Sequence, residues 1–165
     1  MPTHLQFDPA IVEAHEQKFL PSCIPSCVEL VLKLLKRVDA DYYDEQNAWG
    51  NTGDGSFGNF NNRVLFGLRF RNLFHEHPRG AAFPLADLFA RISGELDEGR
   101  FVVISLASSA GWHMYVVYAH ENGEFRAISK ASPPHGQRTV SEDAVKAAVE
   151  SMRGTDILVY EEVQE

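Results

Sequence analysis

Cysteine is scarce in this sequence, and so are long apolar stretches. Two cysteines among 165 residues do not make a disulfide scaffold, so an oxidising compartment is not implied. The apolar runs, such as 101–106, are far shorter than the roughly 20 residues of a membrane-spanning helix. The first residues lack the charged and apolar parts of a signal peptide. The sequence therefore predicts a single cytoplasmic domain over 1–165, with no membrane partner.

Positive charge is also in short supply. The net charge is −8, and lysine and arginine form no basic stripe. Binding to a phosphate backbone depends on those side chains, so we expect no nucleic-acid partner. Lys33, Lys36 and Arg37, like Arg69 and Arg71, are expected on solvated helix faces.

Metal-ligand spacings are missing as well. His75-Glu-His77 and His135 match no helical or finger spacing that would hold zinc. Asp54-Gly-Ser-Phe-Gly58 lacks the alternating acids of a calcium loop. The sequence therefore predicts neither a metal nor another cofactor.

What the sequence does contain is a change of period between its two halves. Apolar residues recur at steps of four and three from Ile24 to Val38, which predicts a helix with one broad buried face. We expect further helices at 9–19, 62–73, 84–96 and 141–152, and a long polar loop at 39–62. Strands are predicted at 101–106, 114–119, 124–129 and 156–160, with a hairpin turn at 121–123. Helices first and neighbouring strands later predict an α+β fold, with helices packed on an antiparallel sheet.

One cysteine lies where a helix favours negative charge. Cys23 falls in the first turn of the 23–38 helix, after Ser22 as a possible N-cap. Unpaired N–H groups and the helix dipole favour a thiolate there, so we expect a lowered pKa. Gln17 carries an amide that can donate to an oxyanion beside the Cys23 N–H. His113 follows a glycine turn at the start of a strand, which completes the pattern of an activated thiol.

These segments resemble a known family. Gln17-Lys-Phe-Leu-Pro-Ser-Cys-Ile-Pro-Ser-Cys27 is similar to the Gln-to-Cys start of papain-like cysteine peptidases. Arg100-Phe-Val-Val-Ile-Ser-Leu106 and Gly111-Trp-His-Met-Tyr-Val-Val-Tyr118 are similar to the buried strand and His strand of the bacterial branch that contains the bacteriocin-processing, double-glycine-leader peptidases. The resemblance spans residues 15–135 and implies a papain-like domain: a Cys-bearing N-terminal helix on a His-bearing sheet. It implies Cys23 as nucleophile, His113 as general base and Gln17 as oxyanion donor.

The chain departs from that family at the third catalytic position. An Asp or Asn usually orients the histidine from the next strand, but this stretch reads Ala127-Ile-Ser-Lys-Ala-Ser-Pro-Pro134. Ser129 or Ser132 therefore stands where an acid or amide is usual. A serine hydroxyl accepts the imidazole N–H but supplies no charge to an imidazolium.

Three functions remain open. The first is a cysteine peptidase, or a related hydrolase or acyltransferase, acting on a peptide or protein substrate. The second is a catalytically silent papain-like domain that binds a peptide in the same cleft. The third is a redox or structural domain that uses Cys23 and Cys27 otherwise, although Cys27 is expected in the core. Trp112 and Trp49 are candidate substrate-binding residues, and Trp112 would alternatively shield the histidine from water. The loop 39–62 is expected to border the cleft.

Overall fold

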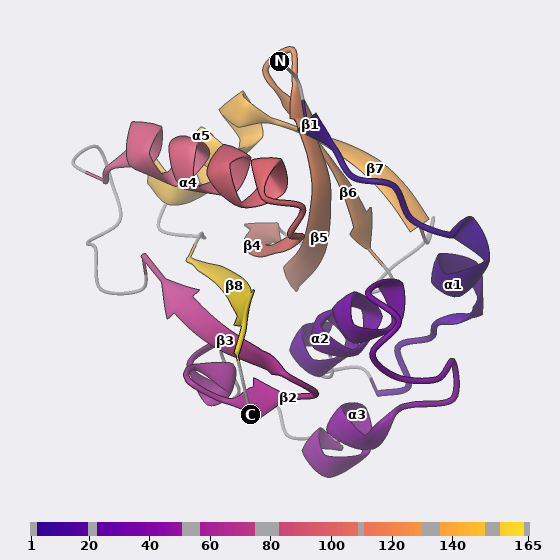
Figure 1. The fold of residues 1–165 in the computed structure, drawn as a ribbon. Helices are drawn as coiled ribbons and strands as arrows, with labels where there is room; N and C mark the ends of the chain where they lie inside the picture. The colour runs from indigo at the N-terminus through magenta and orange to yellow at the C-terminus, as the bar shows by residue number, and fades with distance from the viewer. Residues whose placement is uncertain are drawn as a thin grey trace.

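A computed structural model describes residues 3–19, 23–50, 57–74, 83–108, 111–129, 136–150 and 156–163 (Figure 1). Within these ranges, the side chains of 3–4, 106–108, 111–113, 136–138 and 150 are not part of the description. The elements, in chain order, are β1 (Thr3–His4), α1 (Pro9–Ala14), α2 (Cys23–Leu34), α3 (Asp44–Trp49), the 3-10 helix η1 (Phe57–Phe60), β2 (Val64–Leu65), β3 (Leu68–Leu73), α4 (Leu85–Asp97), β4 (Val102–Ser108), β5 (Gly111–Glu121), β6 (Glu124–Ser129), β7 (Gly136–Ser141), α5 (Glu142–Glu150) and β8 (Ile157–Glu162). No helix in these ranges is long and apolar enough to cross a bilayer.

The described strands form one antiparallel sheet with helices on both faces. Its order is β2-β3-β8-β4-β5-β6-β7, and β1 pairs with β5 beyond Val102, where β4 begins. Helix α2 lies against one face, whereas α4 and α5 lie against the other (Figure 1). Along β5 the side chains alternate accordingly: Met114 and Val116 join the α2 core, and Tyr115 and Val117 face the α4 core. The prediction of an α+β fold with an antiparallel sheet is confirmed.

Helix α2 is buried around its whole circumference. Its core positions Val28, Val31 and Leu32 are inaccessible to solvent, as expected for a helix that is covered on every side. The helix ends at Leu34, before the predicted limit of 38. Lys36 takes a positive φ of 60°, and the N–H of the next residue returns to the carbonyl of Leu32 at 2.9 Å. This left-handed residue closes the helix although it is not glycine.

The hairpin between β5 and β6 forms where the sequence predicts it. Asn122 and Gly123 both have positive φ, 53° and 74°, as a two-residue turn between twisted strands requires. The helix predicted at 84–96 is confirmed as α4, and the helix predicted at 141–152 is confirmed as α5 up to Glu150, since 151–152 lie outside the described residues. The strands predicted at 101–106, 124–129 and 156–160 are β4, β6 and β8.

The helix predicted at 62–73 is wrong, because this segment forms the β2–β3 hairpin. Leu68, Phe70 and Asn72 are buried while Arg69 and Arg71 are exposed, which is the alternation of a strand. The two arginines are therefore solvated, but on a strand.

Two other segments also differ from their predictions. The helix predicted at 9–19 ends at Ala14, because residues 15–18 turn inward to bond with α2 and α3. The expected loop 39–62 contains α3 and η1, and Gln46 of α3 is fully buried. Polar composition alone did not indicate that this stretch contributes to the interior.

Candidate functional site

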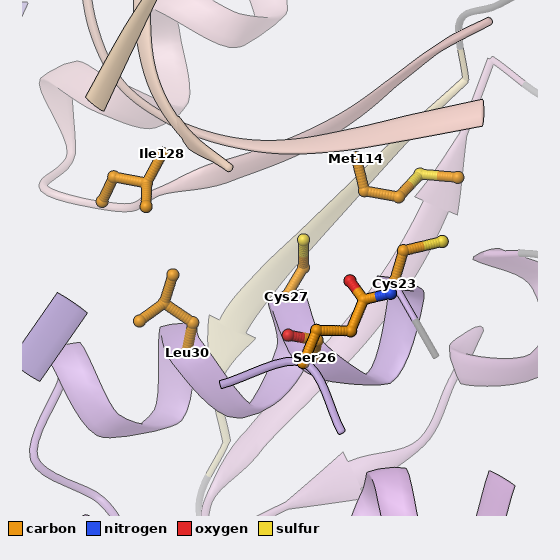
Figure 2. A pocket seen from close by; sticks show the side chains of 7 residues that line it. Cys23, Ser26, Cys27, Leu30, Met114 and Ile128 are labelled. Carbon is orange, nitrogen blue, oxygen red and sulfur yellow. The ribbon is translucent and has the colours of Figure 1, made fainter. Parts of the chain in front are cut away.

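Cys23 is the first residue of α2 and lies half-buried beneath the sheet. It lines a cavity of about 10 Å³, roughly the room that one water molecule needs. The other described residues lining it are Gln17, Ser26, Cys27, Leu30, Met114 and Ile128. Figure 2 shows both thiols directed from the helix toward the strand that carries Met114. The cavity therefore joins the start of α2 to strands β5 and β6.

Gln17 reaches this cavity from the irregular segment that follows α1. Its Nε2 donates to the carbonyl of Phe19 at 3.1 Å. The structure thus brings Gln17 and Cys23 to one cavity wall. One amide hydrogen of Gln17 is already used within its own segment.

His113 lies in β5, with its Cα opposite Leu106 of β4. The next residue, Met114, lines the cavity beside Cys23. The side chains of His113 and Trp112 lie outside the described part of the chain. The approach of His113 to Cys23, and the groove contact of Trp112, therefore stay predictions.

Ser129 closes β6 and is buried, with 1% of its surface exposed. Its Oγ has no hydrogen-bond partner among the described residues. Ser132, the alternative orienting residue, lies outside those residues.

Trp49, the other candidate for substrate binding, ends α3 and stacks on Phe60 of η1, with ring centroids 6.1 Å apart. Its buried Nε1 makes no hydrogen bond within the described ranges. It packs on the α2 core and is not one of the described residues that line the cavity.

The thiols are less acidic than the sequence predicts. Burial raises the pKa of Cys23, while the N–H groups of Ile24 and of Cys23 itself act to lower it. Burial, assisted by the charge of Cys23, raises the pKa of Cys27 much further. The expected lowering at Cys23 is thus corrected: removal from water outweighs the helix N-terminus.

A polar network on another face of α2 was not predicted. Lys33, expected on a solvated face, is only 3% exposed. Its Nζ donates to His15 Nδ1 at 2.9 Å and lies 3.8 Å from the ring centroid of Tyr43, which stacks on His15. His15 Nε2 in turn donates to the carbonyl of Ser26 at 2.9 Å. Burial lowers the pKa of Lys33.

Glu29 completes this network and is inaccessible to solvent. Its carboxylate accepts from the backbone N–H and the side-chain amide of Gln46, at 2.9 and 2.7 Å. Burial raises the pKa of Glu29, although these donors oppose the shift. A Glu–Lys pair one turn apart in an otherwise apolar helix was the available sequence signal, since its charges interrupt the apolar run.

A second missed cluster lies on the α2 face of the sheet. Asp156 accepts from Asn72 Nδ2 at 2.9 Å and from Ser105 Oγ at 3.4 Å. Ser105 is the cross-strand partner of Met114, which lines the thiol cavity. A half-buried carboxylate therefore stands two strands from the residue that follows His113.

In the part of the chain that the structure describes, no three His, Cys, Asp or Glu side chains are placed to share a metal ion. His75, His77 and His135 lie outside that part. No protein-family model matches the chain, and no curated protein matches it either.

Proposed function

We propose that the chain is a papain-like cysteine hydrolase or acyltransferase that acts on peptide or amide bonds. Cys23 is the nucleophile, His113 the general base and Gln17 an oxyanion donor. The observation that supports this best is the shared cavity: Cys23 at the start of α2, Gln17, and Met114 directly after His113. The sequence resemblance supports the same roles.

The chemistry follows from these groups. The Cys23 sulfur attacks the carbonyl carbon while its proton passes to His113, and the carbonyl oxygen becomes an oxyanion. The Cys23 N–H and the Gln17 amide stabilise that oxyanion. When the tetrahedral species collapses, the C–N bond breaks, the amine leaves with the proton, and a thioester remains for water or another acceptor. Because burial raises the pKa of Cys23, the base must act during attack rather than by holding a resting thiolate.

The proposal makes a structural demand on β5. The imidazole of His113 must reach the face of the sheet that α2 covers, which Met114 also occupies. Neighbouring residues of a regular strand face opposite ways, and β4 pairs with β5 without a register shift from Gly111 to Val117, so the proposal requires the imidazole to depart from this regular alternation. Ser129 and Ser132 remain candidate orienting residues, and Asp156 joins them as a carboxylate on that face.

A catalytically silent peptide-binding domain is the second candidate. The raised pKa of Cys23 favours it, since a thiol that burial keeps protonated is a poor nucleophile. Peptide binding without acylation would be its signature.

Acylation by p-nitrophenyl acetate tests the first proposal. Thioester formation releases p-nitrophenolate, and peptide mapping locates the acetyl group. We expect acetyl-Cys23 in wild type and in the matched control Cys27→Ala, and none at that position in Cys23→Ala. His113→Ala should acylate about 10²-fold more slowly, as for loss of a general base. Equal rates in wild type and His113→Ala would contradict the assignment.

A further inference from the structure

Gln17 is bracketed by hydrogen bonds from a single buried side chain. Gln46 Nε2 donates to the carbonyl of Glu16 at 2.8 Å, and Gln46 Oε1 accepts from the N–H of Lys18 at 2.7 Å. The amide thus binds the backbone on both sides of Gln17, as a neighbouring strand would. The segment 15–18 forms no regular helix or strand of its own, so it depends on bonds of this kind for its support.

The clamp is anchored to the helix that carries the nucleophile. Glu29 accepts the second Gln46 Nε2 hydrogen at 2.7 Å and the Gln46 backbone N–H at 2.9 Å. Both hydrogens and the oxygen of the Gln46 amide are therefore engaged. Glu29 and Cys23 belong to α2, so one rigid element fixes the thiol and the anchor of the Gln17 segment.

A third attachment lies at the start of the same segment. His15 binds the Ser26 carbonyl and Lys33 Nζ, which are again on α2. Ser26 also lines the thiol cavity together with Gln17. The segment is thus held to α2 directly through His15 and indirectly through Gln46.

We infer that Gln46 and Glu29 are positioning residues that hold Gln17 in place as an oxyanion donor to the Cys23 site. This inference rests on the function proposed above. A donor stabilises a developing oxyanion only where it is fixed before the reaction, within about 0.5 Å of its productive position. A glutamine on an irregular segment obtains that precision from outside, and the Gln46–Glu29 pair is the buried structure that provides it.

The test separates two reactions of the same thiol. Acetylation by p-nitrophenyl acetate develops an oxyanion, whereas alkylation by iodoacetamide at a saturated carbon does not. Gln17→Ala should slow acetylation roughly 10²-fold, and Gln46→Met, of similar length but without the amide, should slow it by a similar factor. Alkylation should stay within about twofold, and the Gln17→Ala/Gln46→Met double variant should be no slower than either single variant. The control Asn47→Ala alters an exposed neighbour on the same helix and should leave both rates unchanged.

Gln46→Asn, which keeps the amide but shortens its reach, repeats the test if the methionine variant does not fold. Exchange of the Lys18 amide hydrogen, measured by NMR, should become at least about tenfold faster in either variant if the clamp exists in solution. The inference is overturned if the acetylation rate is unchanged in Gln46→Met while it falls in Gln17→Ala. It is also overturned if Gln46→Met slows acetylation and alkylation equally. If wild type forms no acetyl-Cys23 at all, the proposed function fails and the role of Gln46 fails with it. Fast exchange confined to the variants would then identify the clamp as structural only.

Discussion

Alkylation of Cys23 should rise steeply with pH. Burial raises the pKa of its thiol above the ordinary value of about 8.5, so less than about 1% is thiolate at pH 6.5. Below that pKa the thiolate fraction grows about tenfold per pH unit, so the second-order rate with iodoacetamide should increase roughly 50- to 100-fold from pH 6.5 to pH 8.5. Cys27, buried and with a pKa raised further, should react more slowly at every pH.

Mass spectrometry of alkylated peptides measures both sites in one sample, and Cys27→Ala reports Cys23 alone. A rate for Cys23 that is flat between pH 5 and pH 8 would refute the reasoning. Such a plateau would mean that a standing thiolate–imidazolium pair outweighs the burial of the sulfur. Preferential labelling of Cys27 would argue against Cys23 as nucleophile.

Three further predictions concern stability. Replacing Glu29 by Gln should flatten the pH dependence of the unfolding free energy. Burial raises the folded-state pKa of Glu29, so its carboxyl makes the wild type lose stability as pH rises from about 4.3 through that raised value. In urea titrations at pH 4 and pH 8, the stability of Glu29→Gln relative to wild type should therefore be higher at pH 8 than at pH 4. Leu30→Ala should reduce the unfolding free energy by about 3 kcal/mol, because Leu30 is fully buried, and a loss below about 1 kcal/mol would contradict tight packing there. Gly67→Ala should destabilise the fold by about 1–2 kcal/mol, because φ is +82° and the new Cβ would lie 3.0 Å from Arg37 Nη1. Gly94→Ala, whose new Cβ meets open space in α4, should stabilise it by about 0.5–1 kcal/mol. Shifts of the melting temperature in the same direction for both variants would contradict this pair of predictions.

Local signals in the sequence predicted much of the fold. Asn122-Gly123 fixed the β5–β6 hairpin, because few other residues adopt two consecutive positive φ angles. The apolar period of 23–38 located α2 and placed Cys23 in its first turn, where it is the first residue. The β2–β3 hairpin was missed because its turn begins with Phe66, at φ 52°, instead of the Asn that usually marks such turns.

The environment of the candidate site depended on contacts distant in sequence. The sequence around Lys33 predicts a solvated charge, but in the fold His15 and Tyr43 cover its ammonium group. The acidity of Cys23 was predicted from the helix terminus alone, but packing of Met114 and its neighbours against α2 decides the sign of the shift. The desolvation of a side chain such as Cys23 depends on the assembled core, so no local sequence pattern predicts it.

Strand β8 lies between β3 and β4, in the interior of the sheet. Residues 68–73 and 103–104 must therefore leave the ribosome long before the strand that joins them. Until Ile157–Glu162 emerges, both β3 and β4 have an open edge beside apolar side chains. Such edges are the surfaces on which chains associate wrongly, and long-range pairing of this kind slows folding. During synthesis, this protein therefore depends on β8 to remove the aggregation hazard that β3 and β4 create before it.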